Sequence, residues 1–176
     1  ELAVRAVLGH QVTVAAARTL AARLVAHFGA PIETGDAALT RLFPTPGALA
    51  HASSDALGRL GIVRQRQGAI QALARAMAEG ALDLSPHADV PATLQALQAL
   101  PGIGAWTAQY IAMRALRWPD AWPAGDVALH QALGITGTPR ARQQACEARA
   151  TAWQPWRSYA VVRAWAGLHV STQESP

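Results

Sequence analysis

Residues 97–110, with the sequence LQALPGIGAWTAQY, constrain the fold more than any other part of this chain. An apolar helical segment runs into the turn Pro101-Gly102-Ile103-Gly104, and a second helical segment begins directly after it. Such a turn holds two helices close together and leaves backbone N–H groups unpaired at the start of the second helix. Because these N–H groups attract anions, the stretch predicts a helical hairpin with a candidate phosphate site. A glycine-rich corner with no ligand is the alternative reading of the turn alone.

The glycines and carbonyls of this turn supply the chemistry of the candidate site. Gly102 and Gly104 can adopt backbone angles that other residues avoid, and without a Cβ atom they allow a ligand to approach closely. We expect the N–H groups of the two glycines and of the following turn to point at one phosphate. The backbone carbonyls of Gln98, Leu100 and Ile103 are a candidate site for a monovalent cation, Na⁺ or K⁺, bridging to that phosphate.

Helical periodicity continues along almost the whole chain, whereas strand signals are nearly absent. Thr13, Thr45 and Thr138 stand where helix N-caps are expected, and Gly29 and Gly80 stand where helices are expected to stop. The sequence therefore predicts an all-α fold of about ten helices, with loops over 30–44 and 81–90. The expected helices cover 1–10, 13–28, a short stretch from 45, 54–61, 64–79, a stretch from 90 into the hairpin, 105–117, 126–134, 139–152 and 156–169.

Composition narrows the function classes without choosing among them. Hydrophobic residues make up 51 % of the chain and charged residues 15 %, which is typical of a soluble helical core, and no apolar run approaches the ~20 residues of a membrane span. The formal net charge is +4, and all 15 basic residues are arginine. This balance is compatible with nucleic acid binding but is weak support for it by itself. The single cysteine, Cys146, excludes a disulfide within the chain and fits a reducing cytoplasm.

A carboxylate follows the hairpin at a distance of 22 residues: Asp126, in the segment Trp122-Pro123-Ala124-Gly125-Asp126. Asp is a preferred N-cap, so this residue can simply begin the helix expected at 127–134. A catalytic role is compatible with that cap, because capping leaves part of a carboxylate free.

Several segments together resemble the helix-hairpin-helix DNA glycosylases with the Gly/Pro…Asp motif (the HhH-GPD superfamily), most closely the bacterial 3-methyladenine DNA glycosylase II branch. The resemblance covers essentially the whole chain and implies two helical lobes with a DNA-binding cleft between them. The lobes would comprise roughly 30–125 and 1–29 plus 126–176, in one glycosylase domain over 1–176. The chain would then be a fragment that lacks the family's N-terminal domain. The segments that carry the resemblance are Ala3–Gly9, Phe43–Pro46, Leu100–Gly104, Trp106–Ala108 and Trp153–Ala160.

The resemblance implies a role for each candidate site residue. Asp126 would face the sugar of a flipped nucleotide, stabilise the positive charge that develops there, and orient or deprotonate the attacking water. Trp106, Tyr110 and Trp156 would line the base pocket, although spacing alone favours core positions for such aromatics. Further contacts to DNA are expected from Gly102, Ile103, Gly104, Thr107 and the gap-filling residue Gln11.

The implied reaction is hydrolysis without strand cleavage. Bifunctional relatives form a Schiff base through a lysine in the second hairpin helix, where this chain has Trp106, and the chain contains no lysine at all. We expect removal of cationic alkylpurines such as 3-methyladenine and 7-methylguanine, with neutral hypoxanthine as a poorer substrate. No cofactor is required, the partner is duplex DNA with a flipped damaged base, and the location is the bacterial cytoplasm at the nucleoid. Neither a membrane nor a protein partner is indicated.

Two departures from the family pattern affect details of the site. Near relatives have Leu where this chain has Gln11, and Gln can fill the gap in the duplex but gains less from apolar contact. Near relatives have an aromatic residue where this chain has Val127, so a wider and less selective pocket is expected. Two other functions stay open: a non-catalytic hairpin module that only binds DNA, and a glycosylase for mismatched or oxidised bases.

Overall fold

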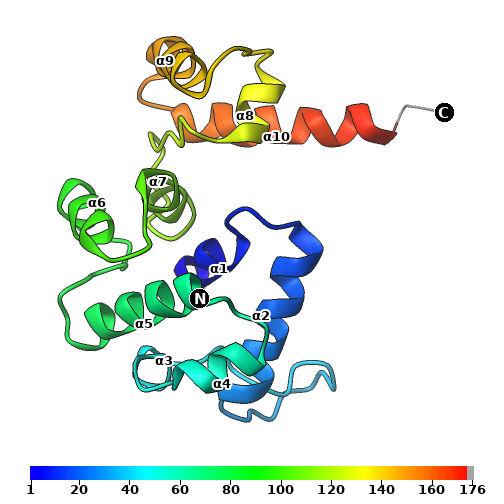
Figure 1. Cartoon of the computed structure of the whole chain (residues 1–176), viewed down its shortest axis with the longest axis vertical. Helices are drawn as coiled ribbons and strands as arrows, with labels where there is room; N and C mark the ends of the chain where they lie inside the picture. The colour runs from blue at the N-terminus through cyan, green and yellow to red at the C-terminus, as the bar shows by residue number, and fades with distance from the viewer. Residues whose placement is uncertain (174–176) are drawn as a thin grey trace.

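The computed structural model describes residues 1–173, and the regular secondary structure of that part of the chain is helical (Figure 1). It contains no β-strand, and the one β-bridge among these residues joins Pro31 and Arg41 within the loop over 30–44. The predicted all-α class is therefore confirmed. The elements are α1 (Leu2–Gly9), α2 (Val14–Phe28), α3 (Pro46–Ala50), α4 (Ser54–Arg59), α5 (Arg64–Ala78), α6 (Val90–Ala99), α7 (Ala105–Arg114), α8 (Val127–Ala132), α9 (Pro139–Ala150), the 3₁₀ helix η1 (Thr151–Trp153) and α10 (Arg157–Gln173).

Side-chain caps begin the helices where the sequence predicts them, with small shifts. The hydroxyls of Thr13, Thr45 and Thr138 accept hydrogen bonds from the N–H group three residues on, as N-caps do. The cap of α4 is Ser53, one residue before the expected start. Helix α7 ends at Arg114 rather than near 117, because Arg117 takes a left-handed φ of 56° that breaks the helix.

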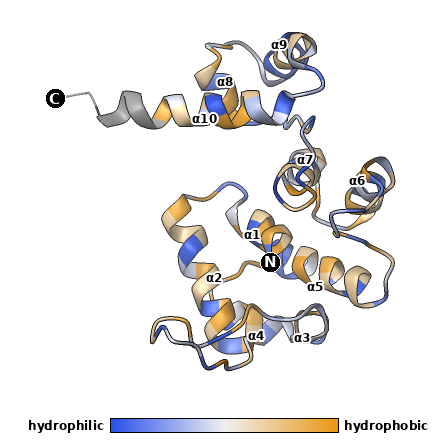
Figure 2. Cartoon of the chain, turned by 180° about the vertical axis from the view of Figure 1, so that it is seen from behind, coloured by the Kyte–Doolittle hydropathy of each residue, from blue (hydrophilic) through white to orange (hydrophobic). Residues whose placement is uncertain are grey.

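Two clusters of buried apolar side chains form the core. The first draws on α1 through α7, from Ala3 to Ile111, and the second on residues from Ala112 to Val161. Helix α1 has predominantly hydrophobic colouring in Figure 2 and buries Val4, Val7 and Leu8 in the first cluster. Residues 1–29 thus pack with residues 30–111, because α1 contacts α5 and α7. The expected division into two lobes, 30–125 and 1–29 plus 126–176, stays a prediction.

Helix α7 connects the two clusters, since Ile111 belongs to the first and Ala112 and Met113 to the second. Figure 1 shows α8, α9 and α10 at one end of the molecule, α1 to α5 at the other, and α6 and α7 between them. The hairpin therefore stands at the junction of the two clusters. No helix in the described residues is long and apolar enough to span a membrane.

Candidate functional site

The hairpin turn between α6 and α7 is held by its own backbone and by contact with α5. The N–H of Leu100 donates to the Leu97 carbonyl at 3.1 Å, and the N–H of Ile103 donates to the Leu100 carbonyl at 3.2 Å. Gly102 has a φ of +80°, and a Cβ atom there would lie 3.0 Å from the Ala69 Cβ. Gly102 is therefore required both by backbone angle and by the close approach of α5.

Gly104 is different, because it does not use the unusual backbone angles that a glycine can adopt. It is the N-cap of α7 with a φ of −87° and a ψ of 176°, which any residue adopts. A Cβ atom at Gly104 would meet no other atom within 4 Å. Neither backbone conformation nor internal packing thus requires a glycine at this position. The open space instead gives a ligand outside the protein close access to the first N–H groups of α7.

The other two predicted contacts of the hairpin have buried side chains. Ile103 and Thr107 are each 3 % exposed, so their side chains pack inside the molecule. Thr107 lies in the first turn of α7, where helix geometry gives backbone N–H groups no intrahelical partner. Any contact of these residues with DNA would therefore come from the backbone rather than from the side chains.

Asp126 is buried, 9 % exposed, and its two carboxylate oxygens accept three hydrogen bonds. Oδ1 accepts from the Leu129 N–H at 2.6 Å, so the residue is the N-cap of α8, as the simpler reading of the sequence predicts. Oδ1 also accepts from Trp165 Nε1 at 3.0 Å, and Oδ2 accepts from Trp106 Nε1 at 2.9 Å. The carboxylate is thus held in one orientation by two indoles from α7 and α10.

The segment that leads to Asp126 is anchored from both sides. The Trp122 N–H donates to Gln109 Oε1 of α7 at 2.9 Å, and the Asp126 N–H donates to the Pro123 carbonyl at 2.9 Å. From within α8, the buried ring of His130 donates from Nε2 to the Ala124 carbonyl at 2.6 Å. These bonds fix the backbone that presents the carboxylate.

Aromatic rings surround this carboxylate. Trp106 and Tyr110 stack with centroids 5.2 Å apart and planes 20° apart, as their spacing of four on one helix predicts. The ring centroids of Tyr110 and Trp165 are 6.0 Å apart, and those of Trp106 and His10 are 5.3 Å apart. Sequence analysis did not single out Trp165, because no spacing rule links it to Asp126, which lies 39 residues earlier in the sequence.

Trp156, the third predicted pocket residue, is placed elsewhere. It is 59 % exposed and packs against Tyr159 with ring centroids 5.9 Å apart. Among the described residues it makes no ring contact with Trp106 or Tyr110. It stands just before α10, nine residues or about two and a half helical turns from Trp165, the residue of that helix that does reach the cluster.

A cavity of about 270 Å³ opens beside the stacked pair formed by Trp106 and Tyr110. Asp126 does not line it but is joined to it through Trp106. Two arginines line it as well, and one of them, Arg5, is paired with Glu1 at 2.8 Å. The full lining is Arg5, Ala6, Gly9, Val12, Val14, Ala17, Arg18, Trp106 and Tyr110.

Gln11 lies at the exposed tip of the loop between α1 and α2. Its φ is 56°, a left-handed conformation that is uncommon for a residue other than glycine. The loop is held by Arg66, which donates from Nη2 to the His10 carbonyl at 2.7 Å. Gln11 and Gly102 both line a polar hollow of about 180 Å³, so the predicted gap-filling residue and the hairpin turn share one face of the molecule.

The proposed cation site consists of the backbone carbonyls of Gln98, Leu100 and Ile103. Such neutral oxygen donors suit a monovalent cation. The Leu100 carbonyl already accepts one hydrogen bond, from the Ile103 N–H, and a carbonyl has a second lone pair to offer. The described residues contain no cluster of three or more His, Cys, Asp or Glu suited to a metal ion. The cation site stays a prediction.

Comparison with known proteins agrees with this geometry. The family described as "HhH-GPD superfamily base excision DNA repair protein" matches residues 4–158. The chain is 42 % identical over all its 176 residues to a "Probable bifunctional transcriptional activator/DNA repair enzyme AlkA" of Mycobacterium tuberculosis, covering 35 % of that protein. It is 38 % identical over 94 % of its length to "DNA-3-methyladenine glycosylase 2" of Escherichia coli, covering 56 %. The chain thus spans between about a third and just over half of these relatives.

Solved structures share the fold. A "3-methyladenine dna-glycosylase from Archaeoglobus fulgidus" superimposes with a TM-score of 0.75 at 22 % identity, over 93 % of this chain and 56 % of that one. A structure described as "MBOgg1 in complex with low affinity DNA ligand" reaches a TM-score of 0.79 at 17 % identity, over 93 % and 57 %. At these identities the likeness shows the fold alone.

Proposed function

The chain belongs to the HhH-GPD superfamily of base excision DNA repair proteins, and from this premise we propose that it is a monofunctional DNA glycosylase for alkylated purines. One observation carries the proposal: the Asp126 carboxylate is held by Trp106 and Trp165 inside a cluster of aromatic rings. A module that only grips phosphates needs the hairpin but has no use for this arrangement. The curated relatives of the chain, named as 3-methyladenine glycosylases or as a DNA repair enzyme, support the same reading.

The reaction follows from what a fixed carboxylate does beside a sugar. Breaking the bond between C1′ and the base nitrogen leaves positive charge on the deoxyribose, and water then adds at C1′ while the base departs. A carboxylate oriented before the reaction stabilises that charge without having to reorganise. Among the described residues, Oδ2 of Asp126 accepts a hydrogen bond from Trp106 alone, so it retains a lone pair for the attacking water or for the developing cation.

Binding of the duplex would use the face that carries the hairpin and the loop of Gln11. The unpaired N–H groups at the start of α7 hold one phosphate, with a cation on the carbonyls of the turn as a bridge. The exposed Gln11 side chain enters the gap that the flipped nucleotide leaves. Unstacking a base costs a few kcal/mol, which these contacts and stacking in the pocket must offset. Such a protein would act in the bacterial cytoplasm, at the nucleoid.

The proposed preference for cationic bases depends on a balance of charges in the pocket. Stacking on Trp106 and Tyr110 favours a cationic base by about 0.5–2 kcal/mol. The guanidinium groups of Arg5 and Arg18 act against it, although Glu1 partly offsets the charge of Arg5. We propose that the aromatic contribution is larger, so 3-methyladenine and 7-methylguanine are released faster than neutral hypoxanthine.

One assay separates this function from its alternatives. The protein is incubated with duplexes that carry 3-methyladenine, 7-methylguanine, hypoxanthine, 8-oxoguanine or a mismatch, and the products are then treated with alkali. We expect strand cuts to appear only after alkali treatment. We expect a high rate only for the two duplexes that carry alkylated purines. Release of none of these bases would favour the non-catalytic module, and release mainly of 8-oxoguanine or of a mismatched base would favour the third function.

The variant Asp126→Asn tests the chemical role of the carboxylate. Asn keeps an oxygen for the cap of α8 and for one indole but carries no charge. We expect base release to fall about 100- to 1,000-fold while affinity for an abasic duplex changes less than about threefold. Equal loss of both properties would mean that Asp126 is structural. Asp89→Asn, which removes the charge from the N-cap of α6 instead, is the matched control.

A further inference from the structure

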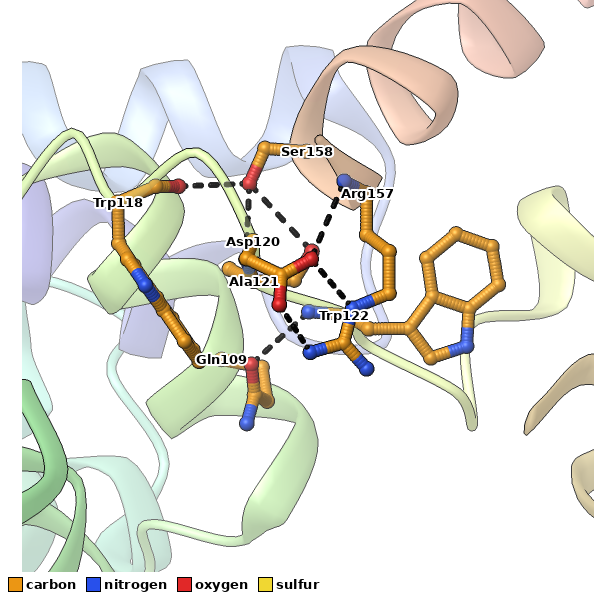
Figure 3. A network of polar contacts seen from close by, with 7 residues as sticks. All are labelled: Gln109, Trp118, Asp120, Ala121, Trp122, Arg157 and Ser158. Carbon is orange, nitrogen blue, oxygen red and sulfur yellow. Dashed lines mark hydrogen bonds and ion pairs between the residues drawn. The ribbon is translucent and has the colours of Figure 1, made fainter. Parts of the chain in front are cut away.

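The segment between α7 and Asp126 has no regular structure over 118–124, and the first turn of α10 binds it through an ion pair (Figure 3). Arg157 donates from Nε to Oδ1 of Asp120 and from Nη2 to Oδ2, each at 2.6 Å. The two side chains are only 20 % and 16 % exposed. A bidentate pair of this kind fixes distance and angle together, which a single hydrogen bond does not.

Ser158 adds backbone contacts to the same segment. Its hydroxyl donates to the Trp118 carbonyl at 2.7 Å and accepts from the Ala121 N–H at 3.0 Å, while its own N–H donates to the Pro119 carbonyl at 2.8 Å. The residue is 7 % exposed, so water does not compete for these bonds. Asp120, Arg157 and Ser158 together form what is here named the α10 clamp, which joins the first turn of α10 to residues 118–121.

The same helix carries Trp165, eight residues after Arg157, or about 12 Å along the axis. Its indole N–H reaches Oδ1 of Asp126 at 3.0 Å, and its ring contacts Tyr110. A rotation of α10 by a single residue is about 100° and would turn this indole away from the carboxylate. The contact between Trp165 and Asp126 therefore requires one particular register of α10.

We propose that the α10 clamp is a positioning device for the candidate active site, acting through Trp165 on the Asp126 carboxylate. Asp120, Arg157 and Ser158 touch neither the carboxylate nor the aromatic cluster in the described contacts, so they are positioning residues rather than catalytic ones. The catalytic part of this inference rests on the proposed glycosylase function. The geometric part, that the clamp determines where the Trp165 indole lies, is independent of that function.

The geometric part is tested by the indole N–H resonances of the ¹⁵N-labelled protein, with Trp165 assigned by its loss in Trp165→Phe. In Asp120→Asn and in Ser158→Ala we expect the Trp165 signal to shift and to exchange faster with solvent. Trp106 belongs to α7 and should keep its hydrogen bond to Asp126, so we expect its indole signal to shift less than that of Trp165. An unmoved Trp165 signal in both variants would overturn the proposal. Because the measurement needs no catalysis, it remains decisive even if the chain releases no base.

The catalytic part is tested by single-turnover excision from a 7-methylguanine duplex, with affinity for an abasic duplex measured beside it. We expect Asp120→Asn to slow excision about 10- to 100-fold and to leave affinity within about twofold. In a Trp165→Phe background the same change should cost much less, since the indole N–H is already absent. Equal losses in both backgrounds would overturn the positioning role, as would an unchanged rate.

Two further variants complete the design. Asp55→Asn makes the same chemical change on the exposed surface of α4 and should leave both the Trp165 resonance and the excision rate as in the unsubstituted chain. Asp120→Glu keeps the charge and should restore part of the rate lost in Asp120→Asn. Failure of the glutamate variant to exceed the asparagine variant would contradict a role for the ion pair.

Discussion

At the scale of single residues, Asp126 shows how one carboxylate serves both the fold and the proposed chemistry. Its bond to the Leu129 N–H caps α8, and this use follows from local sequence. Its bonds to Trp106 and Trp165 do not, because the partners lie 20 and 39 residues away. The cap therefore cannot be taken as an argument against a catalytic role, since the same side chain makes both sets of contacts.

The two hairpin glycines are expected to respond differently to substitution. Gly102→Ala places a Cβ atom 3.0 Å from Ala69 at a φ of +80°, so we expect the free energy of unfolding to fall by about 1–3 kcal/mol. Gly104→Ala meets no atom and should leave stability within about 0.5 kcal/mol. Urea unfolding measures both.

At Gly104, we expect substitution by a large residue to affect affinity for DNA. We expect Gly104→Leu to weaken affinity for damaged and undamaged duplexes alike, because it fills the space in front of the first N–H groups of α7. Fluorescence anisotropy with matched duplexes checks this. A change confined to the choice among lesions would mean that the hairpin does not grip phosphate.

Gln11 offers a second test at this scale, because its backbone favours glycine and its proposed role does not. We expect Gln11→Gly to keep or raise the free energy of unfolding, by up to about 1 kcal/mol, since glycine adopts a φ of 56° without strain. Excision should nevertheless slow, because no side chain remains to fill the gap in the duplex. Gln11→Leu is the control that retains a filling group, and equal excision by the glycine variant would contradict the role.

At the scale of elements, helix starts followed the sequence closely and helix packing did not. Thr13, Thr45 and Thr138 cap the helices predicted for them, because capping is settled within four residues. The pairing of α10 with the segment 118–121 involves Arg157 and Asp120, 37 residues apart, and nothing local requires it. Local sequence does not predict the exposed position of Trp156 either. The packing of α10 places Trp165, and not Trp156, against Tyr110.

The ion pair between these two elements makes stability depend on pH in a defined direction. The hydrogen bond from Arg157 holds the pKa of Asp120 below its ordinary value of 3.8. A carboxyl group whose pKa is lower in the folded state contributes stability above its unfolded pKa and loses it as the pH falls through the folded pKa. We expect Asp120→Asn to cost about 2 kcal/mol at pH 7, with the difference shrinking below pH 3.8. Urea unfolding of both proteins between pH 7 and pH 3 measures this, and a constant difference would contradict it.

At the scale of the whole molecule, α7 is the element on which the site depends. It begins at the hairpin turn, carries Trp106 and Tyr110, and contributes Ile111 to one buried cluster and Ala112 to the other. The proposed phosphate grip and the stacked pair of Trp106 and Tyr110 are consequently parts of one short helix. Their mutual distance is fixed by helix geometry and is insensitive to loop movements elsewhere.

The absence of lysine from this sequence gives a prediction for the chain as a unit. With Trp106 in the second hairpin helix and arginine as its only basic residue type, the chain has no side-chain amine to form a Schiff base with an abasic sugar. Borohydride treatment during turnover should trap no covalent complex with DNA through a side chain. A substitution of Trp106 by Lys provides the comparison, and a trapped complex mapped to a side chain of the unsubstituted protein would contradict the proposed hydrolysis without strand cleavage.

The sequence alone determined the helical class, most helix starts, the hairpin turn and the family, because each depends on neighbouring residues or on a contiguous motif. It also placed Trp106 and Tyr110 on one face, since four residues make about one helical turn. Tertiary structure decided which core receives residues 1–29, which tryptophan of the C-terminal region meets Asp126, and which of Gly102 and Gly104 the fold requires. These outcomes depend on contacts between segments that are distant in the sequence, and they are settled only when whole helices pack against one another.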